Sequence, residues 1–266
     1  MQAVSLGPLV FAGDRLAALV GIGAFMAVTS ILYSRLEPRI GRWSTWALIA
    51  GLITARLGHV VENASGFATE PWRILAVWQG GFSWPWAAGS VVAVSVALVR
   101  TRRTAIGAVL SLAIALFAWN VVWQLTNATP STPMPDAALE NIRGGSTSLT
   151  AFTGKPVVVN LWASWCPPCR REMPMMAEMA AARDDVTFLF VNQGERRTTI
   201  EGYLNNEKLT LSNVLLDTRM DVPRHYATPG LPVTLFIGAD GKLRSIHVGE
   251  ISREALTGAL SRLLAK

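Results

Sequence analysis

The first 126 residues contain four long apolar stretches, and such stretches restrict what this half of the chain can fold into. They are residues 16–33, 43–61, 84–99 and 105–125. A helix needs about 20 mainly apolar residues to cross the hydrocarbon core of a bilayer, so each stretch is a candidate membrane span. The third is short and follows a Gly- and Pro-rich segment, so it is also a candidate re-entrant segment. We therefore expect an α-helical membrane domain of about four spans over residues 1–126.

The arginines of this half are placed asymmetrically around the four stretches. Two groups of three lie between the first and second stretches and between the third and fourth: Arg35, Arg39, Arg42 and Arg100, Arg102, Arg103. The intervening loop, residues 62–72, has acids and no Lys or Arg. Cytoplasmic loops are enriched in Lys and Arg, so both chain ends are predicted on the far side of the membrane. The net charge of +6 lies mainly in this half, which gives no indication of nucleic-acid binding.

No small-residue cleavage site follows the first apolar stretch, so we expect this stretch to be an anchor rather than a removed signal peptide.

Near the end of the second stretch, the ionisable residues Arg56, His59 and Glu62 recur at every third position. They would share one helical face, which suits a lipid-headgroup or proton site facing a protein interior. The same residues would suit the outer interface, where ionisable side chains pair and extend toward water. The second interpretation is the one we favour from the sequence.

The apolar half resembles the N-terminal part of prolipoprotein diacylglyceryl transferase over about residues 5–100. The resemblance is carried by Leu6-Gly7-Pro8, by Ala55-Arg56-Leu57-Gly58-His59 and by Val77-Trp78-Gln79-Gly80-Gly81-Phe82-Ser83. In that family the last motif leads into a stretch with a His implicated in catalysis, and Pro85 takes its place here. The family's later spans, with their essential Arg and Glu residues, are also missing. We expect a non-catalytic scaffold that contacts membrane lipid.

A Pro-rich linker, residues 127–135, separates this half from a second one, because prolines among small polar residues favour extended chain. Residues 136–266 alternate strand and helix patterns over the length of one α/β domain. Strands are predicted at residues 157–162, 186–191, 212–216, 233–237 and 243–248. Helices are predicted at residues 166–182, 198–206, 221–226 and 252–264. The last two strands flank Asp240-Gly241, a pair typical of a β-hairpin turn.

The chain's two cysteines, Cys166 and Cys169, follow a predicted buried strand and begin a predicted helix. The unpaired N–H groups and positive dipole end of a helix N-terminus favour the thiolate, so Cys166 is expected to be the nucleophile. Cys169, one turn deeper, is placed to resolve a mixed disulfide. Pro167 and Pro168 occupy the first turn, where a missing N–H costs little. The two prolines leave fewer donors for the thiolate, which favours a reductant over a strong oxidant.

Other uses of a cysteine pair fit the sequence less well. A structural zinc site needs four ligands, and this half adds only His225 and His247 to the two cysteines. A structural disulfide across two residues would close almost no loop and would add little stability. The pattern therefore predicts thiol–disulfide exchange through Cys166 and Cys169, with no metal and no cofactor besides that redox-active disulfide.

This half resembles the TlpA/ResA family of thioredoxin-like proteins over residues 136–266. Asn160-Leu161-Trp162-Ala163-Ser164-Trp165-Cys166-Pro167-Pro168-Cys169-Arg170 is similar to its active-site segment. Gly230-Leu231-Pro232-Val233-Thr234 is similar to its cis-proline loop, and Val191-Asn192-Gln193-Gly194-Glu195 to the segment that supplies its buried glutamate. The resemblance implies a thioredoxin-like fold. It also implies catalytic roles for Cys166, Cys169, Glu195 and Pro232, and substrate contacts by Trp165, Pro167, Pro168 and Leu231.

Two of these residues have a physical role that can be stated in advance. Pro232, if cis, lacks an N–H and would leave the backbone of Leu231 to pair with an extended substrate beside the sulfurs. Glu195, if buried, would accept or return the proton of Cys169. The alternative for Glu195 is a solvent-facing acid beside Arg196 and Arg197. Asn160 stands where thioredoxin has a buried Asp, which makes Glu195 the expected substitute.

The family's members are extracytoplasmic, often tethered, and mostly keep partner thiols reduced, notably in cytochrome c maturation. The resemblance thus implies a bacterial inner-membrane protein with its thioredoxin-like domain in the periplasm, reducing disulfides of partner proteins there. Because the membrane half has no cysteine, re-reduction would need a membrane thiol donor of DsbD/CcdA type. A disulfide oxidase or isomerase, and a lipid-binding scaffold with a redox-sensing domain, are the alternatives. A surviving glyceryl transferase is a third, which Pro85 argues against.

Overall fold

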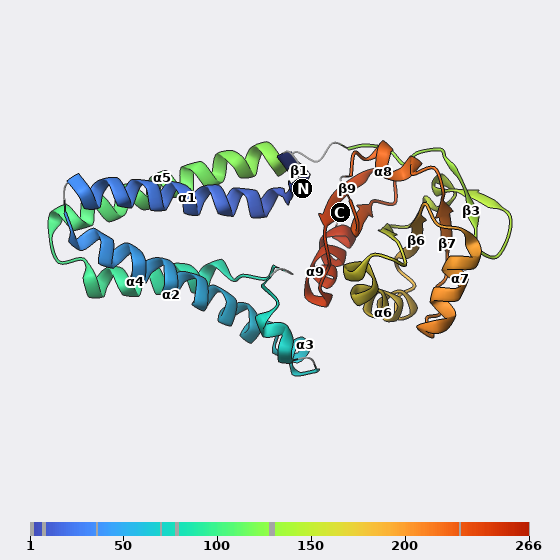
Figure 1. The fold of residues 1–266 in the computed structure, drawn as a ribbon, viewed down its shortest axis with the longest axis horizontal. Helices are drawn as coiled ribbons and strands as arrows, with labels where there is room; N and C mark the ends of the chain where they lie inside the picture. Colours follow the sequence, from blue (N-terminus) through green and yellow to red (C-terminus); the bar gives the residue numbers. More distant parts are fainter. Residues whose placement is uncertain are drawn as a thin grey trace. The chain divides into compact units, whose positions relative to one another are not determined.

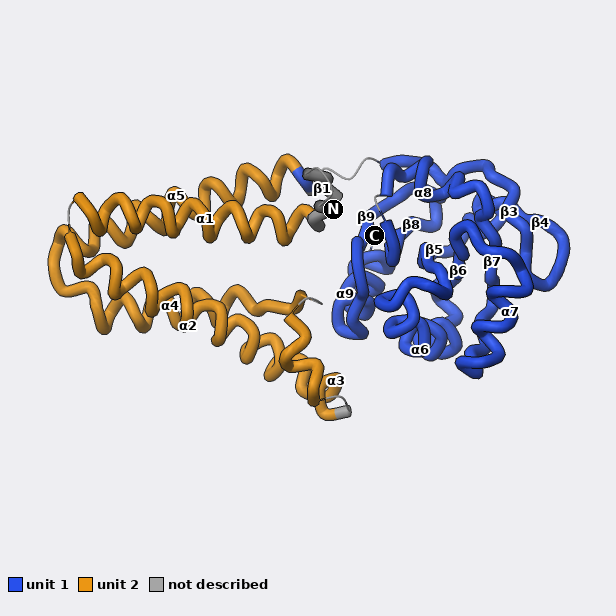
Figure 2. Tube along the Cα trace, viewed as in Figure 1, with its two compact units in different colours: residues 1–12, 126–266 blue, residues 13–125 orange. Residues whose placement is uncertain are grey.

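The computed structural model describes residues 3–6, 9–35, 37–69, 71–77, 80–127, 131–228 and 230–265. It divides into two compact units, residues 13–125 and residues 1–12 with 126–266 (Figure 2). A short antiparallel hairpin of β1 (Ala3–Leu6) and β2 (Leu9–Ala12) belongs to unit 1, which is blue in Figure 2. Gly7, Pro8, Trp78 and Gln79 of the transferase-like motifs, and residues 128–130 of the linker, lie outside the described residues.

Unit 2, residues 13–125, is the helical unit. Its elements are α1 (Gly13–Arg35), α2 (Arg39–Glu62), α3 (Ala64–Thr69), the 3-10 helix η1 (Pro71–Leu75), α4 (Trp84–Leu98) and α5 (Arg102–Asn127) (Figure 1). Among the described residues, α1, α2 and α5 are long and apolar enough to cross a membrane. Helix α4 has 15 residues and a length of about 22 Å, which is less than the hydrocarbon thickness. Three of the four expected spans therefore have full length, and the short third stretch forms the short helix.

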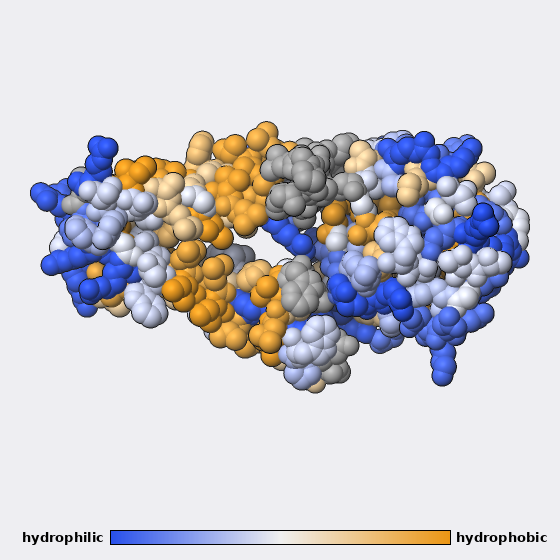
Figure 3. All heavy atoms as spheres, viewed as in Figure 1, coloured by the Kyte–Doolittle hydropathy of each residue, from blue (hydrophilic) through white to orange (hydrophobic). Residues whose placement is uncertain are grey.

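Apolar side chains lie on the outer surface of these helices as well as in the contacts between the helices. Phe117 on α5 and Ile53 on α2 are 72% and 54% exposed, whereas Trp43 is fully buried. Hydrophobic surface covers the helices in Figure 3, and the end where α1 meets α2 and α4 meets α5 is hydrophilic. Helices that are apolar on all sides are typical of membrane spans. At Gly58, an added Cβ would lie 2.2 Å from the Trp86 ring, so glycine allows the close approach of α2 and α4.

Arg56 holds the connection between α2 and α4 together. It is 8% exposed and its guanidinium donates to five backbone carbonyls, those of Arg73, Ile74, Ala76, Gly80 and Gly81. Glu62 accepts a 2.7 Å hydrogen bond from Ser83. The interpretation that Arg56 extends toward water at the interface is therefore wrong, because the loop carbonyls satisfy its donors inside the unit.

Unit 1 contains a seven-stranded mixed sheet in the order β4-β3-β7-β6-β5-β8-β9. The strands are β3 (Ala138–Asn141), β4 (Ser146–Ser148), β5 (Val157–Trp162), β6 (Thr187–Gln193), β7 (Val214–Asp217), β8 (Val233–Ile237) and β9 (Leu243–Val248). Strands β5, β6 and β7 are parallel and the other pairs are antiparallel. The expected hairpin of β8 and β9 is confirmed, with Gly241 at φ +74° in its turn. A thioredoxin-like α/β domain is thus confirmed.

Helices cover both faces of this sheet. They are the 3-10 helix η3 (Leu149–Phe152), α6 (Pro167–Ala181), α7 (Arg197–Asn206), α8 (Asp221–His225) and α9 (Arg253–Leu264). Alternate side chains of β5 enter different cores, with Val158 and Trp162 packing among residues of α6, α7 and α9. Val157, Val159 and Leu161 pack on the opposite face with residues of α8 and η3. Asn160 shares the face of Trp162 and is therefore directed toward α6.

Candidate functional site

The two cysteines form a disulfide at the start of α6. Cys166 is the N-cap residue, and its Sγ accepts a 3.3 Å hydrogen bond from the backbone N–H of Cys169. Pro167 and Pro168 fill the first two helical positions, so the N–H of Cys169 is the first one that the helix offers. Cys166 and Cys169 are 3% and 0% exposed. The predicted strand–cysteine–helix arrangement is confirmed.

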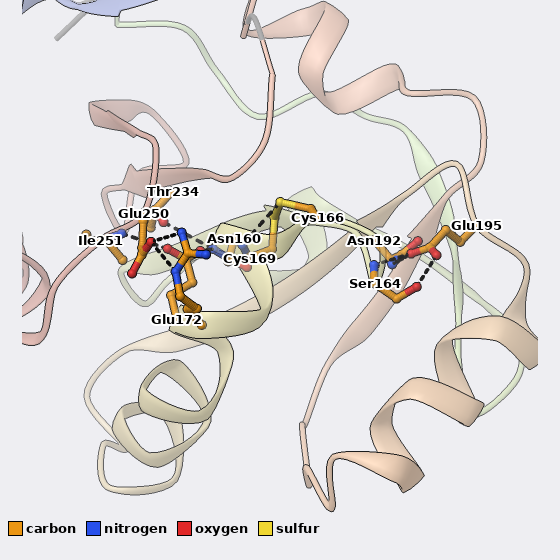
Figure 4. Close-up of a disulfide and its surroundings, with 11 residues drawn as sticks. Asn160, Ser164, Cys166, Cys169, Glu172, Asn192, Glu195, Thr234, Glu250 and Ile251 are labelled. Carbon is orange, nitrogen blue, oxygen red and sulfur yellow. Dashed lines mark hydrogen bonds and ion pairs between the residues drawn. A yellow bond between two sulfur atoms is a disulfide. The ribbon is translucent and has the colours of Figure 1, made fainter. Parts of the chain in front are cut away.

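A buried carboxylate lies one turn below the disulfide. Glu172 is 2% exposed and three residues after Cys169, so the two side chains share a face of α6. Asn160 Nδ2 donates to Glu172 Oε1 and the backbone N–H of Ile251 donates to Oε2, each at 2.8 Å (Figure 4). Strand β5 and the segment before α9 thus fix this carboxyl group beside the cysteines.

Burial dominates the electrostatics of Glu172. Desolvation raises its pKa from 4.5 to about 7, and the nearby Glu250 carboxylate acts in the same direction. The hydrogen bonds from Ile251 and Asn160 and the charge of Arg171 oppose this shift without cancelling it. Arg171 itself binds Glu250 through Nε and Nη2 at 2.9 and 2.6 Å. A carboxyl group with a pKa near 7 can gain and release a proton at neutral pH.

Glu195 does not match the buried carboxylate expected from the sequence. It is only partly buried. Its carboxylate accepts hydrogen bonds from the Ser164 backbone N–H and from Asn192 Nδ2, each at 2.7 Å, and from Ser164 Oγ. Figure 4 shows Glu195 and Glu172 on opposite sides of the disulfide. Glu195 therefore ties the strand-to-helix connection to the end of β6, and a proton-transfer role for it stays a prediction.

Glu172 is the functional candidate that sequence reasoning missed. Asn160 occupies the position of the buried Asp of thioredoxin, and Glu195 was expected to replace that acid. The structure instead has Glu172 on α6, which accepts a hydrogen bond from Asn160 itself. A signal was present in the sequence: an acid three residues after Cys169, on a helical face otherwise occupied by the buried Met173 and Met176. An acid on such a face must be buried, and burial is what alters its proton affinity.

The remaining predicted residues differ in exposure. The Leu231–Pro232 peptide bond is cis, as the resemblance implied. Trp165, beside Cys166, is 66% exposed, although large aromatic side chains are usually buried. Pro167 is exposed, while Pro168 and Leu231 are partly buried. Trp165 and Pro167 are thus accessible on either side of Cys166 in the sequence.

The described residues contain no group of three or more His, Cys, Asp and Glu side chains placed to hold a metal ion. The Nε2 atoms of His225 and His247 lie 2.8 and 3.3 Å from the backbone oxygens of Pro133 and Glu250. The chemistry that this site offers is that of the cysteine pair and the carboxyl group below it.

Comparison with known proteins agrees with this reading of the site. The redoxin family model matches residues 129–262. The chain belongs to the redoxin family. The thiol-disulfide oxidoreductase ResA of Geobacillus thermodenitrificans is 32% identical over 137 residues, which is 51% of this chain and 78% of ResA. ResA of Bacillus subtilis is 28% identical over 157 residues, 58% of this chain and 87% of its own length. This redoxin is therefore a thiol–disulfide oxidoreductase of ResA type.

The helical unit has its own match. The prolipoprotein diacylglyceryl transferase family model covers residues 3–122, so the chain joins a transferase-like membrane part to a redoxin domain, as the sequence motifs implied. Among solved structures, a putative thiol:disulfide interchange protein DsbE from Chlorobium tepidum is 29% identical with a TM-score of 0.46. It covers 50% of this chain and 96% of its own.

Proposed function

We propose that this redoxin is a membrane-anchored, extracytoplasmic enzyme that reduces disulfides of partner proteins through Cys166 and Cys169. The observation that carries the proposal is the cysteine pair at the N-terminus of α6 with the buried Glu172 one turn below. The helix terminus favours the Cys166 thiolate, and the carboxyl group provides a proton acceptor for the deeper cysteine.

The reaction transfers two electrons to the substrate disulfide. In the reduced enzyme the Cys166 thiolate attacks one substrate sulfur, which forms a mixed disulfide and releases the other substrate sulfur as a thiolate. Cys169 then gives its proton to Glu172 and attacks Cys166 Sγ. This step forms the Cys166–Cys169 disulfide and releases the second substrate thiolate. The substrate thiolates take up protons from solvent and from Glu172, so both electrons and both protons are accounted for.

Protein substrates fit the surroundings of the sulfurs. Trp165 is exposed beside Cys166, and the Leu231 backbone precedes a proline that lacks an N–H. We expect an extended substrate segment to pair with Leu231 while Trp165, Pro167 and Pro168 contact its side chains. Glu195 is expected to keep the Ser164 connection in place during this contact.

Re-reduction of the enzyme requires an external electron source. Both cysteines of the chain lie in the redoxin domain, so the helical part supplies no thiol. A membrane thiol donor of DsbD/CcdA type would deliver the two electrons by exchange with the Cys166–Cys169 disulfide. The two Arg groups favour a cytoplasmic position for the helix connections, which supports a redoxin domain that faces the periplasm of a bacterial inner membrane. In this arrangement residues 1–126 anchor the enzyme and contact lipid without transferase activity.

A trapping experiment tests the proposal. The Cys169→Ser variant of the full chain lacks the resolving thiol, so it should accumulate mixed disulfides between Cys166 and its protein substrates in cells. The Cys166→Ser variant is the matched control, because Cys169 is fully buried and should capture nothing. Equal capture by the two variants, or no thiol-sensitive adduct with Cys169→Ser, would contradict the assigned roles.

A further inference from the structure

A cavity opens at the end of the helical unit where α2 begins and α4 ends. Its volume is about 430 Å³, which is within the range of small-ligand sites. The lining residues are Pro38, Arg39, Arg42, Ala97, Leu98 and Arg100. Two basic side chains from the first turn of α2 and one from the connection after α4 thus line this cavity together with the apolar last turn of α4.

The three guanidinium groups of this cavity form no ion pair within the described part of the chain. No ion pair or hydrogen bond there involves the side chains of Arg39, Arg42 or Arg100, all of which are exposed. Residues 35–42 and 97–103 together contain six Arg and a single acid, Glu37. Arg56 differs, because backbone carbonyls occupy its five donors. The planar N–H donors of the three guanidinium groups are therefore available to an external anion, and their geometry matches that of a phosphate group.

The position and the apolar side of the cavity narrow the choice of anion. It lies at the ends of the candidate spans α1, α2 and α5, the level at which lipid phosphates meet the hydrocarbon core. Leu98 continues into the apolar cluster that contains Ile40 and Trp43. A phospholipid presents an anionic group directly joined to apolar chains, so it matches both sides of the cavity. A free phosphate ion would use the arginines alone.

We propose that this cavity binds the headgroup of an anionic phospholipid, with Arg39, Arg42 and Arg100 on the phosphate and Ala97 and Leu98 against the start of the acyl chains. The proposal rests on the membrane association of the helices and does not depend on the thiol–disulfide reaction. Each basic residue near a membrane surface contributes about a fivefold gain in binding affinity. Three guanidinium groups that converge on one phosphate should contribute a larger gain than three scattered ones.

The test uses the full chain in a non-ionic detergent, titrated calorimetrically with dihexanoyl phosphatidic acid as the probe. Saturable one-site binding is expected, with dihexanoyl phosphatidylcholine binding at least tenfold more weakly. The triple variant R39Q/R42Q/R100Q should lose affinity at least thirtyfold. The matched control R35Q/R102Q/R103Q removes the same charge from the same end of the unit but outside the cavity, and should lose several-fold less affinity than the cavity triple variant. A single R100Q variant, in the connection between helices, should lose about fivefold.

Three results would overturn the proposal. Equal losses in the two triple variants would show diffuse surface charge instead of a site. Glycerol 3-phosphate competing at the same concentration as the lipid would show a free-phosphate site. Unchanged binding in R100Q and in the cavity triple would place the lipid elsewhere. Helical circular dichroism and the disulfide-exchange rate of each variant establish that the fold is retained, and neither should change if the lipid site is separate from the redox site.

Discussion

Replacing Glu172 with Gln should remove the pH-dependent contribution that this carboxyl group makes to the stability of the redoxin domain. Burial raises the pKa of Glu172 from 4.5 to about 7 in the folded chain. Below pH 4.5 the carboxyl group is protonated in both the folded and the unfolded chain. Between pH 4.5 and 7 the folded chain alone keeps the proton, so the free energy of unfolding falls as the pH rises. Above pH 7 the loss is complete.

The size of this loss follows from the two pKa values. Each pH unit between them corresponds to 1.36 kcal/mol, so the domain should lose roughly 2 to 3 kcal/mol of unfolding free energy between pH 5 and pH 8 through Glu172. Glu172→Gln is neutral at every pH and should not show this loss. Its amide cannot accept both the Asn160 and the Ile251 donors, so it should also be destabilised by about 1 kcal/mol at all pH values.

Hydrogen exchange measures the effect in the intact protein. Exchange of peptides from β5 and β6 in the detergent-solubilised chain, corrected for intrinsic rates, gives the free energy of unfolding of this domain. The difference in unfolding free energy between variant and wild type should move by roughly 2 to 3 kcal/mol in favour of the variant from pH 5 to pH 8. Glu172→Asp, which keeps a buried carboxyl group, should retain the wild-type slope. A constant difference between Glu172→Gln and wild type would refute the reasoning.

Further predictions concern the reaction and the packing. Glu172→Gln should slow resolution of a mixed disulfide roughly a hundredfold in rapid-quench assays at pH 7, and Glu195→Gln should slow it much less; the reverse order would restore Glu195 as the proton acceptor. Asp217→Ala should cost about 2 kcal/mol by hydrogen exchange, because its carboxylate accepts the Asp221 and Val222 N–H groups at the start of α8, and Asp217→Asn should cost less. Gly58→Ala should destabilise the helical unit by about 2 kcal/mol in detergent melts, since its Cβ would overlap Trp86, whereas Gly23→Ala, with nothing within 4 Å, should not.

Much of the redoxin domain could be predicted because its local patterns agree with its fold. The apolar run at Val157–Trp162 forms β5 over the predicted residues, and Ser252 caps α9 by accepting from the Ala255 N–H. Strands β3 and β4 were not predicted. Both strands are short. β4 is a polar edge strand that pairs with β3, and β3 pairs with β4 and β7, so pairing defines these strands rather than their own side chains.

The site was predicted where chemistry follows from local sequence and missed where it depends on tertiary contact. The cysteine pair is read directly from spacing and helix position. Glu172 is defined by the Asn160 side chain from β5 and the Ile251 N–H from before α9, which are distant in sequence. Arg56 shows the same limit in the helical unit, because its acceptors are carbonyls of a loop about 20 residues further on. Periodicity places such residues on a face but does not identify what faces them.

The redox state of Cys166 and Cys169 in living cells tests the proposed direction of electron flow most directly. Acid quenching of cells that express the full chain, followed by alkylation with a mass-shifting reagent, separates the dithiol from the disulfide form. We expect a mostly reduced pair that becomes oxidised when membrane thiol donors are deleted. A mostly oxidised pair in cells with intact donors would contradict a reductase and would assign the site to disulfide formation or to redox sensing.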